Sequence, residues 1–256
     1  MSVSLLIDAG NSRIKWALVV RDSWQTGAVT AVGPGMEALT DALAPLERPD
    51  SVIVSNVRGE AFAQNLQQWI HAHWQTKVAF ARSESVWSRL ENGYSDPGAL
   101  GVDRWMGLIG AACGFTPPFC VVDLGTTITA DWVDAAGRHR GGVIAPGIQA
   151  MIDTLNIRTQ GIETPNIKAL RPDLTHPFGC DTTEAILLGV HLSAAGLIEK
   201  AALRAQKAVG DGFILILTGG DAERISPYLE LPHKRDEWLV FRGLEALLLK
   251  RRISTD

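Results

Sequence analysis

The chain has 256 residues and a mass of 27.6 kDa, which corresponds to one large domain or two small ones at roughly 100–200 residues per domain. Hydrophobic residues make up 46% and charged residues 20% of the chain, a composition typical of globular proteins that excludes disordered and fibrous classes. The net charge of −4 gives no basic field for nucleic acid, and no apolar run approaches the ~20 residues of a membrane span. We therefore expect neither nucleic acid nor a membrane as a partner.

The N-terminal residues and the cysteines both indicate a cytoplasmic location. The chain reaches Asp8 before the apolar core of a signal peptide could form. Its three cysteines, Cys113, Cys120 and Cys180, cannot all pair with one another, and none lies in a Cys-x-x-Cys motif. We expect reduced thiols and no zinc ribbon.

The first half of the chain alternates predicted strands and helices. Short apolar or β-branched runs predict strands, and apolar residues at helical spacing predict helices. The predicted strands are 3–8, 13–20, 24–29, 51–57 and 77–81. The predicted helices are 36–46, 60–74 and 102–114, and the Gly-, Pro-, Asn- and Asp-rich segment 91–101 is predicted to be a loop.

The strand pattern returns after Pro117-Pro118. A strand opens at Cys120, and the later predicted strands are 128–133, 138–144 and 213–217. The predicted helices are 146–155, 182–209 and 243–252, and the proline-containing segment 158–179 is predicted to be a long irregular connection. Strands that alternate with helices indicate α/β layers.

A short motif occurs once in each half. Ile7-Asp8-Ala9-Gly10-Asn11-Ser12 and Val122-Asp123-Leu124-Gly125-Thr126-Thr127 share the pattern apolar-Asp-x-Gly-polar-hydroxyl, and Trp16 and Trp132 follow at similar offsets. An internal repeat constrains the whole fold. We therefore expect two similar α/β halves that each open with a β-hairpin; the alternative is a coincidence between two short hairpins.

The first motif has the chemistry of a phosphate site. Gly10 lets the backbone approach a ligand closely, Asn11 and Ser12 supply donors beside the N–H groups of the turn, and Lys15 adds positive charge. Asp8 accepts only, and could face a magnesium ion or its waters. The alternative is a plain hairpin in which Asp and Asn are turn formers.

The second motif predicts a matching clamp from the other half. Two Asp-x-Gly turns that face each other would hold a nucleotide tail between two domains. The later segment Thr218-Gly219-Gly220-Asp221-Ala222 follows a predicted strand, and its glycines would let the backbone pack against adenine and ribose. Its alternative is an ordinary strand–turn–helix connection.

Several motifs in a fixed order carry a resemblance to a known family. Two Asp-x-Gly hairpins with a late Thr-Gly-Gly segment resemble the acetate and sugar kinase, Hsp70 and actin superfamily. The full set, which spans about residues 5–245, resembles the type III pantothenate kinases. Its motifs are Asp8-x-Gly10-Asn11-Ser12-x-x-Lys15, Tyr94-x-x-Pro97-x-x-Leu100-Gly101-x-Asp103-Arg104, Asp123-x-Gly125-Thr126-x-x-Thr129-x-Asp131, Gly141-Gly142-x-Ile144-x-Pro146-Gly147 and Thr218-Gly219-Gly220.

The resemblance implies a fold and a function. The fold would be α/β, with duplicated actin-like (ribonuclease H-like) lobes, each a mixed β-sheet with flanking helices, and a cleft between them. The first lobe would be 1–116, with the first phosphate loop and the catalytic Asp, and the second 117–256, with the second phosphate loop and the adenosine segment. The function would be ATP-dependent phosphorylation of pantothenate to 4′-phosphopantothenate, the first step of coenzyme A synthesis, by a cytoplasmic homodimer.

The resemblance also implies roles for individual residues. Asp103 would be the base that receives the proton of the pantothenate hydroxyl. ATP would bind with Mg²⁺, and Asp123 would bind a monovalent cation, potassium or ammonium. The implied ATP-binding residues are Asp8, Ala9, Gly10, Asn11, Ser12, Arg13, Ile14, Lys15 and Thr126. The implied substrate-binding residues are Tyr94, Gly101, Val102, Asp103, Arg104 and Thr182.

Plainer interpretations remain open for these residues. Asp103 could simply favour a helix N-terminus, and Asp181 with Glu184 fits a capping box in which Thr182 is only a first-turn residue. Tyr94 could pack on the core, and Arg104 could pair with an acid inside the protein instead of the pantothenate carboxylate.

The chain departs from the family pattern at four positions, and its function has two alternatives. Asp181 stands where the family usually has Asn, Ser12 where Thr is common, and Thr127 and Val102 where Ala is frequent. The added charge of Asp181 could alter the pantothenate pocket. The alternatives are a non-catalytic ATP-binding accessory factor of the same family and a kinase of another small alcohol. Small residues along 182–209, namely Gly189, Ala194, Ala195 and Gly196, could form a dimer face.

Overall fold

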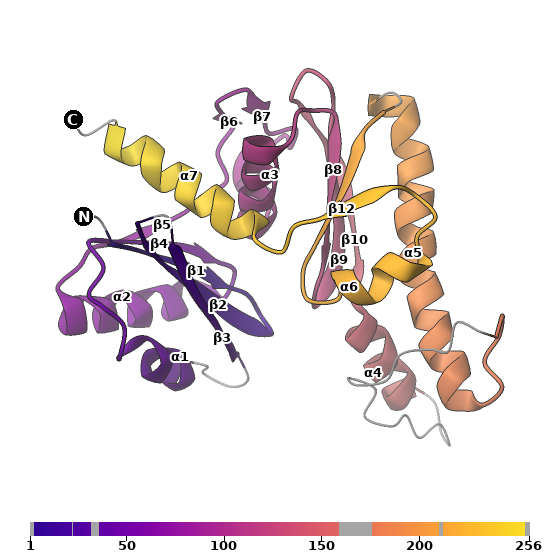
Figure 1. Ribbon diagram of the computed structural model, residues 1–256, viewed down its shortest axis with the longest axis horizontal. Coiled ribbons are helices and arrows are strands. Elements are labelled where there is room, and N and C mark those ends of the chain that lie inside the picture. Colours follow the sequence, from indigo (N-terminus) through magenta and orange to yellow (C-terminus); the bar gives the residue numbers. More distant parts are fainter. Residues whose placement is uncertain (1–2, 22, 32–35, 159–175, 210–211, 254–256) are drawn as a thin grey trace. The chain divides into compact units, whose positions relative to one another are not determined.

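Two five-stranded sheets organise the chain (Figure 1). The computed structural model describes residues 3–21, 23–31, 36–158, 176–209 and 212–253. The chain divides into unit 1, Met1–Phe115 with Trp238–Asp256, and unit 2, Thr116–Glu237. The sequence analysis assigned everything after residue 116 to the second lobe, whereas segment 238–256 groups with unit 1. The reason is that helix α7 (Leu239–Ile253) packs against helix α3 (Val102–Gly114).

The sheet of unit 1 has the order β3-β2-β1-β4-β5. The first three strands form an antiparallel meander, and β4 and β5 then add in parallel to β1. The strands are β1 (Val3–Ala9), β2 (Arg13–Val20), β3 (Ser23–Thr30), β4 (Ser51–Asn56) and β5 (Val78–Phe80). A separate small hairpin pairs β6 (Val86–Trp87) with β7 (Leu90–Glu91).

Helices cover both faces of this sheet (Figure 1). Helices α1 (Met36–Leu43) and α2 (Glu60–Trp74) pack on one face, and α3 and α7 on the other. Because side chains alternate along a strand, one half of each strand faces each helix pair. The core under α1 and α2 includes Leu5, Ile7, Trp16, Leu39, Leu66 and Ile70.

Glycines allow α3 and α7 to cross closely. A Cβ atom on Gly110 of α3 would overlap the backbone of Leu239, and one on Gly243 of α7 would overlap the backbone of Met106. The contact is reciprocal, because each helix presents a glycine to the main chain of the other. It fixes the C-terminal helix on unit 1.

The sheet of unit 2 repeats that of unit 1, in the order β10-β9-β8-β11-β12. Antiparallel pairs join β8, β9 and β10, and β11 and β12 add in parallel to β8. The order and the directions match unit 1 strand for strand, which confirms the predicted internal repeat. The strands are β8 (Phe119–Leu124), β9 (Thr127–Val133), β10 (His139–Pro146), β11 (Ile214–Thr218) and β12 (His233–Arg235).

Helices α4 (Ile148–Arg158), α5 (Thr182–Val209) and α6 (Ala222–Ile225) belong to unit 2. The buried face of α5 includes Ile186, Ile198 and Ala194, which pack in one core with the sheet. Ala194 and Ala195 are buried, so the prediction that they form a dimer face is wrong. Gly189 and Gly196 are exposed.

Most predicted elements are confirmed, and helices 60–74, 102–114 and 182–209 agree to the residue. The short elements β6, β7 and β12 were not predicted, and α6 begins at Ala222, where the strand–turn–helix alternative for segment 218–222 puts a helix. Trp16 and Trp132 follow the two motifs at similar offsets but are not equivalent in the two sheets, because Trp16 pairs with Ile7 whereas Trp132 pairs with Cys120. Of the predicted irregular connection, residues 159–175 lie outside the described residues.

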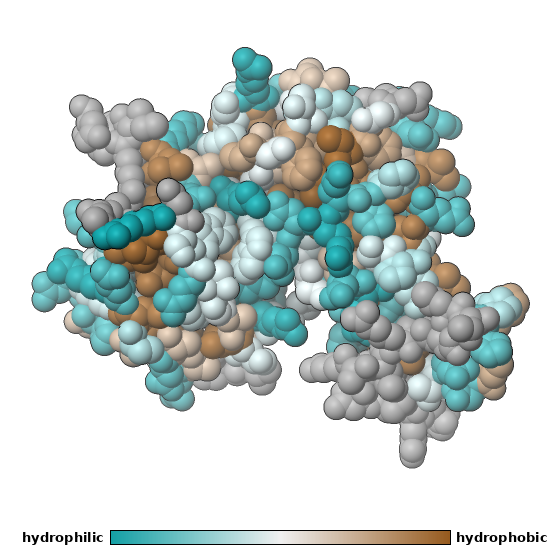
Figure 2. Space-filling model, in the orientation of Figure 1, coloured by the Kyte–Doolittle hydropathy of each residue, from teal (hydrophilic) through white to brown (hydrophobic). Residues whose placement is uncertain are grey.

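Helix α5 is long and apolar enough, by length and composition alone, to cross a membrane; no other helix in the described ranges is. Within its most apolar stretch, 44% is buried in the protein. One such helix is weak evidence for a membrane span, because the core helix of a water-soluble protein meets the same criteria. On the face drawn in Figure 2, hydrophobic residues reach the surface in separate patches among hydrophilic ones.

Candidate active site

In unit 1, three polar side chains form a row where β1 ends. Asp8 pairs in register with Lys15 of β2 and with Ser55 of β4, so the three side chains project from the same face of the sheet. Asp8 and Lys15 are half-buried and Ser55 is buried. The row puts a carboxylate, an ammonium group and a hydroxyl side by side.

The turn after Asp8 is exposed at its tip. Asn11, Ser12 and Arg13 are exposed, and a Cβ atom on Gly10 would lie 2.9 Å from the carbonyl oxygen of Arg13, so this turn requires glycine. Two other residues of the predicted ATP-binding set, Ala9 and Ile14, lie in the hydrophobic core at 0% exposure. Their side chains cannot meet a ligand, and only their backbone could.

A residue that the sequence analysis missed holds this turn. Arg58, in the connection from β4 to α2, donates from Nη1 to the carbonyl oxygens of Gly10 and Asn11, at 3.3 Å and 3.1 Å. The contacting residues are 47 and 48 positions apart in the chain, so no local pattern could have found them.

Asp103, Arg104 and Tyr94 meet at the beginning of α3. The Arg104 guanidinium donates from Nη1 to the Tyr94 hydroxyl at 3.0 Å, and its Cζ lies 5.6 Å from the centre of the tyrosine ring. Asp103 is half-buried in the first helical turn, where the helix dipole stabilises a carboxylate. Its Oδ1 accepts the backbone N–H of Arg104 at 2.8 Å, which fixes the orientation of the carboxylate.

Gly101 leaves the space that this carboxylate occupies. A Cβ atom at position 101 would lie 2.7 Å from Asp103 Oδ1. The predicted motif Gly101-x-Asp103-Arg104 therefore has a local physical reason. The glycine at the N-cap of α3 lets the aspartate side chain fold back over the helix start.

The loop that carries Tyr94 is organised by a buried amide. Asn92 is 6% exposed, and its Nδ2 donates to the carbonyl oxygens of Glu84 and Pro97, each at 3.2 Å. Its Oδ1 accepts the N–H of Tyr94 at 3.0 Å. Asn92 thus replaces the hydrogen bonds that regular secondary structure would supply. The sequence analysis took this Asn only as a loop former.

In unit 2, Asp123 occupies the place that Asp8 has in unit 1. It pairs in register with Thr129 of β9 and Thr218 of β11. Gly219 has φ +90°, and a Cβ atom there would overlap Asp123 Oδ1 and the carbonyl of Leu124. The Thr-Gly-Gly segment can therefore pass directly over the Asp123 turn only because it is glycine.

Backbone hydrogen bonds tie two further segments to that turn. Asp221 donates its N–H to the carbonyl of Leu124 at 2.9 Å, and Gly147 donates to the carbonyl of Thr126 at 3.0 Å. A Cβ atom on Gly147 would overlap the carbonyl of Gly125. The structure thus brings together three segments that the sequence analysis singled out separately, namely 123–127, 141–147 and 218–222.

Thr182 lies exposed in the first turn of α5, between Asp181 and Glu184, whose side chains accept backbone N–H groups at the helix start. The carboxylate of Asp181 accepts the N–H of Glu184 at 2.8 Å, and the carboxylate of Glu184 accepts the N–H of Cys180 at 2.8 Å. The Asp181 half of the predicted capping box is confirmed, whereas Glu184 reaches the N–H of Cys180, one residue before Asp181, instead of that of Asp181 itself. Asp181 therefore has a local structural role at this helix start.

The described residues contain no group of three His, Cys, Asp or Glu side chains that could hold a metal ion. Each Asp-x-Gly turn offers a single carboxylate instead. This donor set fits a hard cation whose remaining ligands are phosphate oxygens or waters, as is usual for Mg²⁺ at nucleotide sites. At Asp123, the hydroxyls of Thr129 and Thr218 add oxygen donors in the same row.

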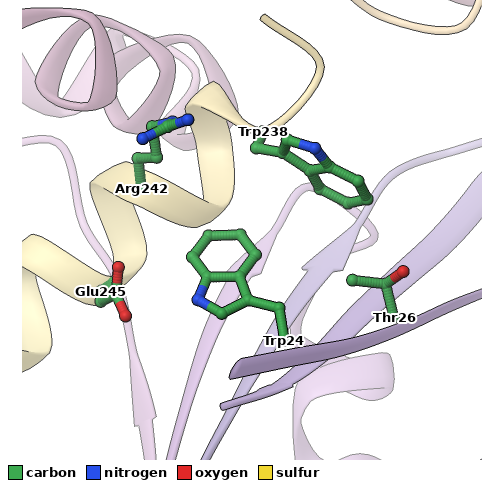
Figure 3. A pocket seen from close by; sticks show the side chains of 5 residues that line it. All are labelled: Trp24, Thr26, Trp238, Arg242 and Glu245. Atoms are coloured by element: carbon green, nitrogen blue, oxygen red, sulfur yellow. The ribbon is translucent and has the colours of Figure 1, made fainter. Parts of the chain in front are cut away.

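A separate cavity of about 460 Å³ lies near the other end of the sheet in unit 1 (Figure 3). Trp24 stands edge to face with Trp238, with ring centres 6.0 Å apart. Trp24 of β3 pairs in register with Val19 of β2, which pairs with Ser4 at the beginning of β1. Asp8 lies near the other end of β1. The lining residues are Trp24, Thr26, Trp238, Arg242 and Glu245.

Two sheets of identical order, each with an Asp-x-Gly turn after its first strand, define the fold of actin-like ATPases and sugar kinases. MreB 5 of Spiroplasma citri, bound to AMPPNP, has this fold with a TM-score of 0.55 and 13% identity over 100% of this chain and 99% of that one. A protein of Campylobacter jejuni described as a Baf family transcriptional activator has a TM-score of 0.63 and 22% identity over 97% and 98%. These similarities show the fold alone, and the predicted fold class is confirmed.

The family follows from closer relatives. The type III pantothenate kinase of Burkholderia thailandensis is 37% identical over 254 residues, which cover 94% of this chain and 96% of the relative. That of Nitrosococcus oceani is 35% identical over 247 residues, with 94% and 91% covered. The family model of type III pantothenate kinase matches residues 4–204. The chain belongs to the type III pantothenate kinase family, as the motifs predicted.

Proposed function

We propose that the protein transfers the γ-phosphoryl group of ATP to the 4′-hydroxyl of pantothenate, the first step of coenzyme A synthesis. Membership of the family over nearly the full length supports this reaction. The observation that carries it is the arrangement at the start of α3, where Gly101 makes room for the oriented carboxylate of Asp103 next to the Arg104–Tyr94 pair.

The proposed reaction needs alignment and charge neutralisation more than covalent help from the protein. The hydroxyl oxygen of pantothenate forms a bond to the γ-phosphorus, the bond from that phosphorus to the β–γ bridging oxygen breaks, and ADP leaves. Asp103 accepts the proton of the hydroxyl as the new bond forms. Its bond to the Arg104 N–H keeps the carboxylate in one orientation for this transfer.

Arg104 is proposed to bind the pantothenate carboxylate. A guanidinium suits a carboxylate because its fork of donors matches the two oxygens. The Tyr94 hydroxyl would hold the guanidinium in place, since the two already contact each other at 3.0 Å. An acid of the protein competes for Arg104 in the alternative interpretation. Gly101, Val102 and Thr182 complete the proposed acceptor site.

The two Asp-x-Gly turns are proposed to bind the same ATP. Residues 8–15 and Thr126 would hold the phosphates, Asp8 would face Mg²⁺ or its waters, and 218–222 would pack against adenosine. Asp123 would bind potassium or ammonium together with the oxygens of its row. Mg²⁺ and the monovalent cation would neutralise phosphate charge when bound. The two turns would hold the protein oxygen atoms that face these cations.

An assay of ADP release with and without pantothenate, and with and without potassium, tests the proposal. Asp103→Asn should abolish turnover and leave nucleotide binding intact, because it removes the proton acceptor and keeps the shape. Asp41→Asn, on the exposed side of α1, is the matched control and should behave as wild type. Normal turnover of Asp103→Asn would refute the assignment.

The same assay separates the alternatives. An accessory factor would bind ATP and never consume it with pantothenate. A kinase of another small alcohol would release ADP with a sugar or a different alcohol as acceptor, and not with pantothenate.

We further propose a cytoplasmic homodimer. All three cysteines are free thiols, which suits a reducing compartment. On α5, Leu192 and Leu203 are 49% and 56% exposed and share one side with Gly189 and Gly196, so a second copy could cover this stripe. Leu192→Glu should then convert a dimer to a monomer in size-exclusion chromatography with light scattering. A wild-type monomer would contradict the proposal.

A further inference from the structure

We propose that Arg58 is a positioning residue that holds the turn Gly10–Ser12 in the conformation that binds the phosphates of ATP. The inference rests on the proposed function, because it takes this turn to be a phosphate loop. Arg58 does not belong to any motif that the sequence analysis singled out. Its side chain connects the β4–α2 connection with two other segments of unit 1.

Three carbonyl groups accept hydrogen bonds from the one guanidinium. Nη1 donates to the carbonyl oxygens of Gly10 and Asn11, at 3.3 Å and 3.1 Å, and Nη2 donates to that of Ala31 at 3.4 Å. Ala31 in turn donates its N–H to the carbonyl of Ser12 at 3.0 Å. The turn, the end of β3 and Arg58 therefore form one closed set of hydrogen bonds.

These bonds determine which way the N–H groups of the turn point. In a planar trans peptide, the C=O and the N–H of the same unit point in opposite directions. The peptide units after Gly10 and Asn11 aim their oxygens at Arg58, so the N–H groups of Asn11 and Ser12 point away from it. Two successive N–H groups on one side of a turn form a concavity that favours an anion.

Arg58 is itself held firmly. Its backbone N–H donates to Oδ1 of Asn56 at 3.0 Å, and Nδ2 of Asn56 donates to the carbonyl of Gly59 at 2.9 Å. Gly59 has φ +88°, a backbone conformation that favours glycine. The guanidinium carbon lies 5.1 Å from the ring centre of Phe62, which is buried in the core. The side chain is thus oriented before any ligand arrives.

The charge of the guanidinium adds to this effect. Hydrogen bonds from an ionised donor are roughly twice as strong as neutral ones. A positive charge behind the carbonyls also favours negative charge on the side of the N–H groups. A loop ordered in advance loses less conformational entropy when it binds phosphate. Removing Arg58 should therefore weaken ATP binding and leave the pantothenate site unchanged.

The test compares Arg58→Met, Arg58→Lys and the control Arg48→Met with wild type. Met keeps the apolar stem over Phe62 and loses every donor, whereas Arg48 is an exposed arginine of the same unit. Arg58→Met should raise KM for ATP about ten-fold, as expected for loss of charge-assisted hydrogen bonds, with little change in KM for pantothenate. Arg58→Lys should recover only part of the loss, because one ammonium cannot span three carbonyls.

Hydrogen exchange provides a readout that does not depend on turnover. In the absence of nucleotide, the backbone amides of 9–12 and 31 should exchange faster in Arg58→Met than in Arg48→Met, and exchange in α3 should stay the same. Melting temperatures of all variants report any general loss of stability.

The outcomes separate this inference from the proposed function. If wild type neither binds nor consumes ATP, the proposed function fails. An unchanged exchange pattern in Arg58→Met would then also overturn the inference that Arg58 holds the turn Gly10–Ser12. If wild type is active, equal KM for ATP in Arg58→Met overturns the inference. So does an equal rise in both KM values, which indicates general damage, or full recovery by Arg58→Lys, which indicates direct contact between the charge and phosphate.

Discussion

The two Asp-x-Gly turns occupy the same place in two sheets of the same order, yet they are held in different ways. In unit 1, a side chain from a neighbouring connection, Arg58, donates to the carbonyls of the turn. In unit 2, backbone N–H groups of Gly147 and Asp221 donate to the carbonyls of Thr126 and Leu124. A duplicated fold thus preserves the position of a turn, while the groups that brace it differ between the copies.

The sheet faces that carry the two aspartates differ as well. In unit 1, Leu6 pairs in register with Ala17 and Ile53, and all three lie on the sheet face that α3 and α7 cover. In unit 2, the equivalent residue Val121 pairs in register with Asp131, which is buried. Oδ1 of Asp131 lies 2.9 Å from Nε2 of His139. Unit 1 closes this face with apolar packing, and unit 2 places a hydrogen-bonded polar pair there.

The largest expected effect comes from disturbing the close packing of Gly219 over the Asp123 turn of unit 2. Gly219→Ala would force an L side chain into φ +90° and into the Leu124 carbonyl, so we expect a loss of roughly 2–5 kcal/mol of stability and of most turnover. Urea unfolding and the ADP-release assay measure both. The control Gly114→Ala, at the exposed end of α3, meets no atom within 4 Å and should keep the stability and turnover of wild type. Equal stability and turnover of the two variants would contradict the claim that the Asp123 turn requires glycine at position 219.

A smaller effect is expected from the helix pair that closes unit 1. Gly243→Ala would push a methyl group into the backbone of Met106, which should cost roughly 1–3 kcal/mol in the free energy of unfolding. Gly114→Ala, at the exposed end of α3, meets no atom within 4 Å and serves as the control. If limited proteolysis released α7 equally from both variants, the glycine crossing would not be what fixes α7 on unit 1.

The smallest effect concerns a buried histidine of unit 2 and the pH dependence of stability. His191 of α5 lies against Tyr228, with ring centres 5.2 Å apart, and its Nδ1 contacts the carbonyl of Leu187 at 2.6 Å. Burial lowers the pKa of His191, an effect that the Leu187 hydrogen bond opposes and the nearby Arg224 reinforces. The unfolded chain therefore binds a proton at a higher pH than the folded one.

It follows that stability should fall as the pH drops through the usual histidine range near 6.5, and level off below the folded pKa. His191→Phe retains an aromatic ring at this position and removes the titrating imidazole. The midpoint of urea unfolding should therefore change less between about pH 7.5 and 5.5 in this variant than in wild type. An identical pH dependence in both proteins would show that other groups are responsible.

Local patterns were sufficient to predict most of the fold. Helix 60–74 was predicted from its apolar spacing, and strands 3–8 and 13–20 from their apolar runs, because burial of one face imposes a period on the sequence. Elements of two or three residues, such as β6 and β12, leave no such period. They form by pairing with the neighbouring strands β7 and β11.

The motifs themselves were visible in the amino-acid order, because a turn or a close backbone approach that leaves no room for a Cβ atom requires glycine at that position. Gly10, Gly101, Gly147 and Gly219 each stand where a Cβ atom would meet another group. The groups that hold those motifs, Arg58 for the first turn and Asn92 for the Tyr94 loop, were decided only by tertiary structure. Arg58 contacts residues 47 and 48 positions away, and Asn92 donates to Glu84 on the far side of the β6–β7 hairpin, so neither contact leaves a periodic trace in the chain.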